Sequence, residues 1–323
     1  MQLEVHHFRN FEHKTFDFQE KNLIIGENAT GKTNILDAIY LTLRARTKNN
    51  IPNQSLIKFS RENALIKNNI YGKRIEMLIN KTNKTIKLND KKLNSTIVLW
   101  HYFKVFYINH FDSLLLSQEP KNKRKFLDDA ILNANPEKIK LYKDLKALNT
   151  QKNYILKHKK DKELIKSYDI KLTQLSQEIS NLRENVLNNI ILNTKEFLKE
   201  EDIKVKFYKT LESKEMENKD IIEERTKRNI INPSRDNFSV KVKDIDSTFL
   251  STGEIKKFSM ALHLAKINIF KEYNCISLFD ELDSFFDKAN LELLSKWVQK
   301  IKGYVFITSN SDLALENFKK IFL

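Results

Sequence analysis

Two of the five glycines of this 323-residue chain lie in one short segment, Gly26-Glu27-Asn28-Ala29-Thr30-Gly31-Lys32-Thr33. The segment fits the pattern G-x-x-x-x-G-K-[ST]. It follows the apolar run of residues 23–25, and the residues after it, to about residue 46, place apolar side chains at helical spacing without Gly or Pro. The sequence therefore predicts a strand, a phosphate-binding loop and a helix in direct succession.

The chemistry of this loop follows from its residue types. Backbone N–H groups of the loop and of the helix start donate to phosphate oxygens. The Lys32 ammonium neutralises the β and γ phosphates of a nucleotide, and the Thr33 hydroxyl binds the accompanying magnesium ion. We therefore expect ATP and Mg²⁺ as cofactors, Thr33 as a metal ligand, and the whole loop as the nucleotide contact, namely Gly26, Glu27, Asn28, Ala29, Thr30, Gly31, Lys32 and Thr33.

A second segment supplies the acids that such a loop requires. The apolar run of residues 275–279 ends in Asp280 and Glu281. Asp280 is expected to bind Mg²⁺ through water. Glu281 is expected on the other side of the strand end, where its carboxylate polarises the attacking water as a general base. Lys32, Asp280 and Glu281 are therefore the predicted catalytic residues, and Asp280 joins Thr33 at the metal.

The remaining patterns predict a sheet-rich first part. Strand-like alternation covers residues 2–8, 14–18 and 75–93, the last with a tight turn at Asn89 and Asp90. The strongly apolar residues 97–108 predict a further strand.

The middle of the chain is predicted to be helical. From Pro136 to about residue 199, apolar residues recur at coiled-coil spacing, and no Gly or further Pro intervenes. The basic, polar residues 157–162 interrupt this stripe. We therefore expect an antiparallel helical hairpin with its tip at these residues, and the alternative is one long surface helix.

Composition narrows the class of partner. Hydrophobic residues make up 41% of the chain, which excludes a wholly disordered protein. Lys and Arg number 57 against 42 Asp and Glu, and the resulting net charge of +15 favours a polyanion such as nucleic acid. The basic residues expected to contact nucleic-acid phosphates are Arg44, Arg46, Lys48, Lys123 and Arg124.

Cysteine and histidine content limits metal chemistry and suggests a compartment. The single cysteine, Cys275, excludes an intrachain disulfide and favours a reducing compartment. His6 and His7 are adjacent, so on a strand they face opposite sides and do not predict a metal site. No signal peptide or membrane-length apolar stretch is found. We therefore expect a cytoplasmic protein without a membrane partner.

A third segment, Phe249-Leu250-Ser251-Thr252-Gly253-Glu254, precedes another uninterrupted helical pattern. Gly253 lets the backbone approach a ligand closely at the helix start. In its position before the acidic strand, the segment resembles the LSxGE signature of ABC-type ATPases. This resemblance implies that Ser251 and Gly253 contact nucleotide bound to the opposite subunit. It also implies that Asp283 matches the D-loop and that residues 308–310 occupy the switch position, where the usual histidine is absent.

The chain as a whole resembles the RecF family of SMC-like ATPases. Three segments carry this resemblance: the opening Phe8-Arg9-Asn10-Phe11, the helix Gly31-Lys32-Thr33-Asn34-Ile35-Leu36-Asp37-Ala38-Ile39-Tyr40, and the basic Lys121-Asn122-Lys123-Arg124-Lys125-Phe126-Leu127-Asp128. The segment Asn232-Pro233-Ser234-Arg235-Asp236 is similar to the family's GPHRDD box, with Asn232 in place of Gly and Ser234 in place of His.

The resemblance implies a fold and a domain organisation. The expected fold is α/β, an ABC-type P-loop ATPase head with a mixed sheet, plus an inserted helical lid with a short antiparallel coiled coil. Residues 1–108 are expected to form the N-terminal part of the head and residues 109–232 the lid and hairpin. Residues 233–323 are then the C-terminal part of the head, which carries the signature and the acidic strand.

The resemblance also implies a function. It is an ATP-dependent DNA-binding clamp in recombinational DNA repair and replication-fork recovery, with a weak, DNA-stimulated ATPase activity. Such a protein dimerises on ATP, binds duplex or gapped DNA and helps load recombinase on single-stranded DNA. The implied partners are DNA, a second copy of the chain, and RecO-like and RecR-like mediator proteins.

Two other functions stay open at this stage. One is another SMC-like ATPase of the phage-defence or nuclease-associated type, although that class normally carries an appended nuclease domain and only residues 311–323 follow the switch segment. The other is a nucleotide-gated protein scaffold without DNA binding, in which the positive charge is only compositional. A steep fall of DNA affinity with the logarithm of salt concentration would favour the clamp over the scaffold.

Overall fold

The computed structural model describes all residues of the chain except 49–50, 159–160, 200–201 and 285–287. It contains two compact units: unit 1 is Met1–Ser113 with Lys266–Leu323, and unit 2 is Leu114–Ala265. The sequence predicted domain boundaries at 108/109 and 232/233. The main difference is that residues 233–265, expected in the head, belong to unit 2. These residues pack within unit 2 because β10 (Asn237–Val242) pairs antiparallel with β9 (Ile203–Tyr208).

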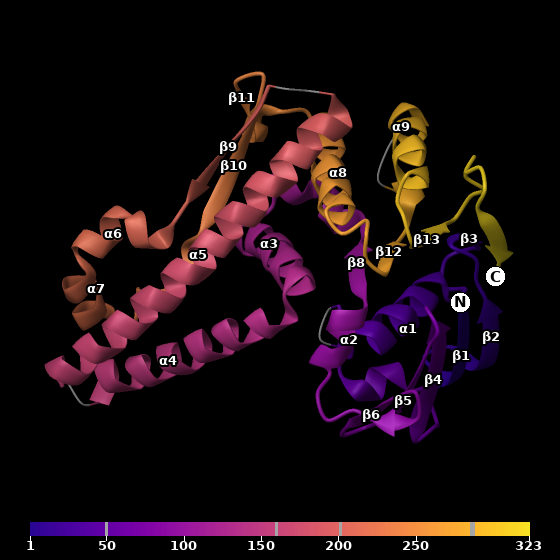
Figure 1. The fold of residues 1–323 in the computed structure, drawn as a ribbon, viewed down its shortest axis with the longest axis horizontal. Coiled ribbons are helices and arrows are strands. Elements are labelled where there is room, and N and C mark those ends of the chain that lie inside the picture. Colours follow the sequence, from indigo (N-terminus) through magenta and orange to yellow (C-terminus); the bar gives the residue numbers. More distant parts are fainter. Residues whose placement is uncertain (49–50, 159–160, 200–201, 285–287) are drawn as a thin grey trace. The chain divides into compact units, whose positions relative to one another are not determined.

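A parallel sheet forms the centre of unit 1 (Figure 1). Its strand order is β14-β3-β13-β12-β8, and every neighbouring pair runs parallel. All side chains of β12 are buried, as a sheet covered on both faces requires. Because the strands are parallel, their carboxyl ends meet at one edge. The bounds are β3 Lys21–Ile25, β8 Lys104–Ile108, β12 Cys275–Phe279, β13 Tyr304–Ser309 and β14 Lys319–Phe322.

An antiparallel sheet with the order β2-β1-β4-β5-β6-β7 is the second layer of unit 1. Its strands alternate buried and exposed side chains, which leaves one face on the core and one toward solvent. The predicted turn is confirmed, since Asn89 and Asp90 have φ of 48° and 63° between β6 and β7. The bounds are β1 Gln2–Phe8, β2 Phe11–Asp17, β4 Asn63–Ile70, β5 Lys73–Asn80, β6 Lys84–Leu88 and β7 Lys91–Lys92.

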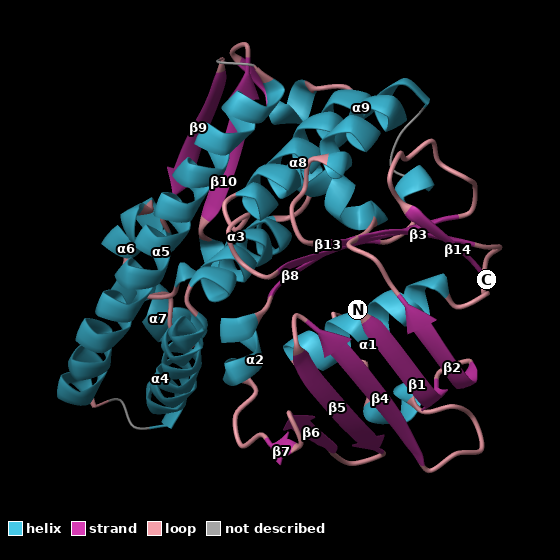
Figure 2. Ribbon diagram, turned by 45° about the vertical axis from the view of Figure 1, so that its right-hand side comes forward, coloured by secondary structure: helices cyan, strands magenta, loops and turns pink. Residues whose placement is uncertain are grey.

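Helix α1 (Lys32–Arg44) lies between the two sheets of unit 1 and contacts β4 and β5 of one and β8 and β13 of the other (Figure 2). Ten of its residues are buried, which explains its nearly continuous apolar pattern. Helix α9 (Lys288–Gln299) precedes β13.

The prediction of one strand over residues 97–108 is wrong in its first half. Residues Ile97–Tyr102 form helix α2, and only Lys104–Ile108 form strand β8. Leu99 and Trp100 are buried on α2, and the Trp100 indole donates a 3.1 Å hydrogen bond to the carbonyl of Arg44. A short apolar run suits a helix and a strand equally well, so the packing against α1 decided between them.

Unit 2 contains the helical hairpin, as predicted. Helix α4 (Ile139–His158) and helix α5 (Lys162–Leu198) pack side by side, and α5 also packs on α3 (Pro120–Ala134). Leu145 of α4 and Leu172 and Ile179 of α5 are buried together with Ile231. Part of the predicted tip, residues 159–160, lies outside the described residues. The Asp161 side chain caps α5 by accepting from the backbone N–H of Leu164 at 3.0 Å.

The rest of unit 2 is a small sheet and shorter helices. Strand β10 lies between β9 and β11 (Ile245–Asp246). The helices are α6 (Lys214–Glu217), α7 (Lys219–Thr226) and α8 (Thr252–Asn268), whose last turn belongs to unit 1. Short 3-10 turns are Asn53–Leu56, His110–Ser117, Pro136–Lys138, Thr210–Glu212, Pro233–Arg235, Ser247–Phe249 and Leu282–Ser284. Within the described part of the chain, no helix has both the length and the hydropathy of a membrane span.

Candidate functional site

The order of strands in the parallel sheet of unit 1 brings three predicted segments to one edge. Strand β13 lies between β3 and β12. The glycine loop follows β3, Asp280 follows β12, and Asn310 follows β13. Side chains from chain positions far apart therefore meet at the carboxyl end of the sheet, where α/β proteins commonly bind ligands.

The Lys32 ammonium lies at the centre of this edge. It donates to the carbonyl oxygens of Gly26 at 2.6 Å and Glu27 at 2.8 Å, and to Oδ1 of Asn310 at 2.8 Å. Lys32 is buried, so these three oxygens replace its hydration. A phosphate oxygen is a stronger acceptor than a carbonyl or amide oxygen, so this ammonium is poised for an anion.

Asp280 receives hydrogen bonds from three hydroxyl groups. Its Oδ1 accepts from Thr33 at 3.0 Å and from Thr308 at 2.9 Å, and its Oδ2 accepts from Tyr107 at 3.0 Å. Burial, with the nearby carboxylates of Asp37 and Asp280, raises the pKa of Tyr107 well above its usual value, so Tyr107 stays a donor. Thr33 and Asp280 together form an oxygen-only ligand set, which suits Mg²⁺.

Thr308 also connects the two acids, which sequence reasoning missed. Its Oγ1 accepts a 2.7 Å hydrogen bond from the backbone N–H of Glu281 while donating to Asp280. Glu281 has φ of 56°, and its side chain is exposed. The left-handed backbone turns Glu281 away from the strand direction, so its side chain is exposed while that of Asp280 is buried.

Asn310 occupies the place where the ABC resemblance expects a histidine. Its side chain accepts from Lys32, and its backbone N–H donates to Oδ2 of Asp283 at 2.8 Å. Asn310 therefore connects the glycine loop to the residue that matches the D-loop.

The glycine loop has the shape and the polarity of an anion cradle. Gly31 has φ of 107°, and a Cβ atom there would lie 2.7 Å from Asn10 and from Phe11, so only glycine fits. Asn10 supports the loop, donating to the carbonyl of Thr30 at 3.3 Å and accepting from Asn34 at 2.7 Å. Helix α1 has no side-chain cap and no acid in its first turn. No side-chain cap therefore occupies the first N–H groups of α1, which suits phosphate binding at this helix start.

Asp37 of α1, the helix that follows the glycine loop, forms an ion pair with Arg9. Arg9 and Asp37 are 2.6 Å apart, and both belong to the segments that carry the RecF resemblance. Burial raises the pKa of Asp37 to about 6; Arg9 opposes this rise and Asp280 adds to it.

The signature segment lies in unit 2, at the start of α8. The Ser251 hydroxyl and backbone N–H donate to Oε2 of Glu254 at 2.7 and 2.9 Å, and the Glu254 N–H donates back to Ser251 at 3.3 Å. This reciprocal pairing caps the helix, and the Ser251 bonds lower the pKa of Glu254. Residues 251–254 are exposed, and no atom lies within 4 Å of the space that a Cβ on Gly253 would fill. The segment is therefore open to a ligand.

Asp236 of the GPHRDD-like box is held in place by several hydrogen bonds. Asp236 is fully buried, and it accepts hydrogen bonds from Thr210, from Ser180 at 2.7 Å and from Arg183 at 3.0 Å. Arg183 also pairs with Asp128 at 2.8 Å. Asp236 thus links α5 to the segment before β10, and this link is internal to unit 2.

The five basic residues predicted to contact nucleic acid differ in exposure. Arg44 and Lys123 are buried, Arg44 over the Trp100 ring and Lys123 donating to the carbonyl of Phe238, so they do not belong to a phosphate-binding surface. This corrects the prediction for these two residues. The other three are half-buried: Arg46 lies over Trp100, Lys48 pairs with Asp112 and Arg124 donates to the carbonyl of Asp236.

Comparison with known proteins shows which proteins the chain as a whole resembles. The DNA replication and repair protein RecF of Clostridium acetobutylicum is 26% identical over 96% of this chain and 93% of its own length. That of Psychromonas ingrahamii is 29% identical over 99% of this chain and 94% of its own length. Over nearly its whole length, this chain is similar to RecF. The resemblance inferred from the motifs is confirmed.

Solved structures show that the fold of this chain is also similar to that of RecF. The recombination mediator protein RecF-ATPrS in the RecFOR pathway has a TM-score of 0.87, with 23% identity over 100% of this chain and 95% of that chain. The Smc head bound to the C-terminal winged-helix domain of ScpA has a TM-score of 0.56, with 15% identity over 96% of this chain and 89% of that chain. The fold is therefore the predicted ABC-type ATPase head with an inserted helical part. A family model described as a protein of unknown function (DUF2813) matches residues 1–56.

Proposed function

We propose that this protein is an ATP-dependent DNA-binding clamp of the RecF type, acting in recombinational repair and replication-fork recovery in the cytoplasm. The observation that carries the proposal is the hydrogen bond between Thr33 and Asp280 beside the buried Lys32 ammonium. The relatives named for DNA replication and repair and the RecF-ATP structure in the RecFOR pathway support it.

Different residues of the site are proposed to contact different parts of the nucleotide. Lys32 exchanges its carbonyl partners for the β and γ phosphates, while the α1 N-terminus and the loop backbone bind the remaining phosphate oxygens. Thr33 and Asp280 would hold Mg²⁺ in place of their mutual hydrogen bond. When bound, Mg²⁺ supplies positive charge that stabilises the leaving phosphate oxygen.

Hydrolysis depends on the exposed Glu281 and on Asn310. Glu281 is the general base for water, and Asn310, which already contacts Lys32, senses the γ phosphate in place of the missing histidine. The proposed activity is a slow, DNA-stimulated ATPase that needs the signature segment of a second subunit to complete the site.

A second copy of the chain supplies that contact. Ser251 and Gly253 are exposed at the start of α8, and no atom lies near the Cβ position of Gly253. The Ser251 N–H and hydroxyl donate to Glu254, and in the proposed contact they exchange this carboxylate for a phosphate oxygen. In the proposed dimer they bind the γ phosphate held by the opposite subunit. ATP binding then forms the clamp, and hydrolysis releases it.

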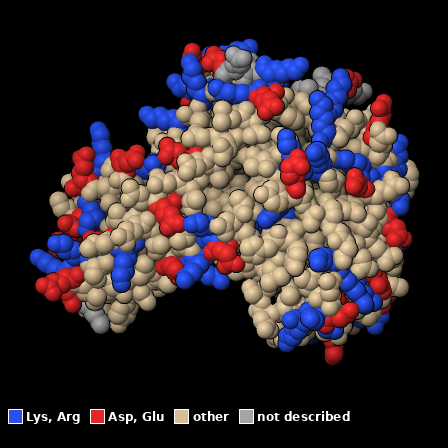
Figure 3. Space-filling model, viewed as in Figure 1, with Lys and Arg blue, Asp and Glu red and all other residues tan. Residues whose placement is uncertain are grey.

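Exposed lysines of unit 2 add to the proposed DNA surface. Lys204 and Lys206 of β9 and Lys241 of β10 are exposed, and Lys204 lies directly opposite Lys241 in the sheet. Positive side chains gather in this region (Figure 3). Lys204 also pairs with Asp244 at 2.7 Å, so a bound phosphate would compete with this carboxylate for the Lys204 ammonium. Arg46, Lys48 and Arg124 stay as predicted contacts, and RecO-like and RecR-like proteins as partners for loading recombinase.

The decisive experiment is sedimentation with ATP and Mg²⁺, combined with binding to gapped, duplex and single-stranded DNA. Glu281→Gln should accumulate an ATP-bound dimer that holds DNA and releases it when ADP replaces ATP. Lys32→Ala should lose nucleotide binding, and the matched control Glu272→Gln, at an exposed acid outside the site, should behave as the unchanged chain. A Glu281→Gln variant that stays monomeric with ATP contradicts the clamp.

The salt dependence of DNA binding tests the lysine surface. Changing Lys204 and Lys241 to Gln should reduce the slope of log affinity against log salt by about 2, since each phosphate contact contributes roughly 0.9. Lys87→Gln, in unit 1 and paired with Glu76, is the control and should leave the slope unchanged. An unchanged slope in the double variant would place the DNA elsewhere.

A further inference from the structure

The solvent face of the antiparallel sheet in unit 1 carries a cluster of Glu4, His6 and His13. His6 on β1 and His13 on β2 are direct cross-strand neighbours, and their rings stack with centroids 4.2 Å apart at 12°. Oε1 of Glu4 lies 2.5 Å from Nε2 of His6 and 3.7 Å from Nε2 of His13. The three ligand atoms lie within 4.8 Å of one another, and no other such group of three occurs among the residues that the structure describes.

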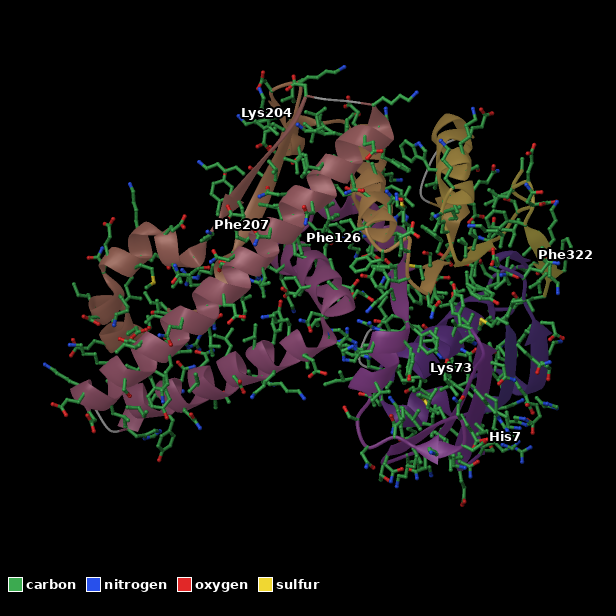
Figure 4. All side chains as sticks on the ribbon, viewed as in Figure 1. His7, Lys73, Phe126, Lys204, Phe207 and Phe322 are labelled. Atoms are coloured by element: carbon green, nitrogen blue, oxygen red, sulfur yellow. The ribbon has the colours of Figure 1, made fainter. Side chains whose placement is uncertain are left out.

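Strand pairing explains why these residues meet. Leu3 and Val5 are buried, so Glu4 and His6 alternate with them onto the partly exposed face. The hairpin between β1 and β2 then brings His13 beside His6. His7, the sequence neighbour of His6, has φ of 51° and instead pairs with Glu12 at 3.2 Å. Figure 4 labels the position of His7.

We propose that Glu4, His6 and His13 form a binding site for a divalent transition-metal ion, with zinc as the ion expected. Two imidazole nitrogens and one carboxylate oxygen are a ligand set that zinc accepts, with water in the fourth position. Metal–ligand bonds of about 2.0–2.2 Å in a tetrahedron place ligand atoms roughly 3.3 Å apart. Oε1 of Glu4 and Nε2 of His13, 3.7 Å apart, are near that separation, whereas the stacked rings of His6 and His13 must rotate before both nitrogens can point at one ion.

Among the residues that the structure describes, Lys67 is the lysine that pairs with Glu4, and it makes the proposal testable. Lys67 on β4 lies opposite Glu4, and its Nζ donates to Oε2 at 3.2 Å and to Oε1 at 3.3 Å. Glu4 can therefore give Oε1 to the metal while Oε2 stays with Lys67. The ammonium also repels the cation, so the site is weaker than its ligand set alone allows.

The experiment uses the full chain without a histidine tag and without nucleotide. Zinc binding is measured by calorimetry, and Co²⁺ binding by visible absorption, which reports imidazole and carboxylate coordination. The unchanged chain should bind one ion. His13→Gln and Glu4→Gln should each lose at least tenfold in affinity, whereas His158→Gln, at an exposed histidine of α4, should bind as the unchanged chain.

The variant Lys67→Met is expected to change zinc affinity in the opposite direction. It keeps the aliphatic part of the side chain but removes the positive charge that repels the ion. It should raise zinc affinity several-fold, a gain that a nonspecific surface site would not show. Circular dichroism checks that each variant is folded, and His6→Gln replaces any variant that is not. The proposal is wrong if the unchanged chain binds no zinc, or if folded His13→Gln and Glu4→Gln variants bind it with unchanged affinity.

Discussion

The Thr33 hydroxyl donates a 3.0 Å hydrogen bond to Asp280, a residue 247 positions further along the chain. Thr33 begins α1 after β3, and Asp280 follows β12, with β13 between these strands. The order of the strands thus holds together the hydroxyl and the carboxylate that we propose as ligands of Mg²⁺. Such preorganisation means that little reorganisation is needed when charge develops in the reaction.

Thr308 is predicted to position both acids. Thr308→Val keeps the volume but removes the hydroxyl that contacts Asp280 and the Glu281 N–H. Losing hydrogen bonds of this kind should reduce kcat for ATP hydrolysis by roughly tenfold, with nucleotide affinity nearly unchanged. Steady-state kinetics with fluorescent-nucleotide binding measure this split. Ser277→Ala, in buried β12, is the control; an equal loss there would mean a general effect on the sheet.

Asn310 is predicted to act on the γ phosphate. Asn310→Ala keeps the backbone bond to Asp283 but removes the contact with Lys32, so ATP hydrolysis should fall about tenfold while ADP affinity stays the same. Asn310→His, which restores the residue usual at this position of ABC ATPases, should retain more activity than Asn310→Ala. Equal hydrolysis by the alanine variant and the unchanged chain would exclude a sensing role.

Cys275 is predicted to be unreactive in the folded chain. Burial in β12 raises the pKa of its thiol to about 12. A thiol reagent at pH 8 should therefore label the native protein much more slowly than the denatured protein, and the single cysteine makes the measurement site-specific.

The raised pKa of the Cys275 thiol makes the stability of the folded chain depend on pH. The folded chain keeps a proton that the unfolded thiol loses above about pH 9, so this group's contribution to the free energy of unfolding falls as the pH rises from 9 toward 12. Cys275→Ala should weaken that dependence in alkaline denaturation. Rapid native labelling at pH 8 would contradict both expectations.

Lys152 is predicted to be essential for the stability of unit 2. Its fully buried ammonium lies 2.5 Å from Asp169 and 2.7 Å from Glu223, and it donates to Asn229 at 2.9 Å. Lys152→Ala leaves the buried Glu223 without its nearest cation, since Lys219 pairs with Asp169 at 2.7 Å but lies 3.9 Å from Glu223. This change should lower the free energy of unfolding by about 3 kcal/mol. Denaturant unfolding monitored by hydrogen exchange in α4 and α5 measures this.

A double variant controls for the change in packing. Lys152→Met with Glu223→Leu removes both charges, so it should cost less than Lys152→Ala alone. A larger loss in the double variant would show that volume, and not charge, determines the stability of this region.

Local patterns determined much of the fold and part of the site. The loop Gly26 to Thr33, the acidic strand end at Asp280 and the period of the hairpin helices depend on residues close together in the chain, so their hydrogen bonding and burial are readable from spacing. Asn89 and Asp90 similarly predicted their turn, because a tight turn requires a backbone that these side chains tolerate.

Only the tertiary structure decided which distant groups meet. Residues 97–102 became a helix through packing against α1, and Arg44 and Lys123 were buried where their charge alone predicted exposure. Thr308 and Tyr107 reached Asp280, and His13 reached His6, through strand order and register. Local periodicity can be recognised in any short segment of a sequence. The pairing of strands that are far apart in the chain depends on the sum of all packing interactions, so no single segment predicts it.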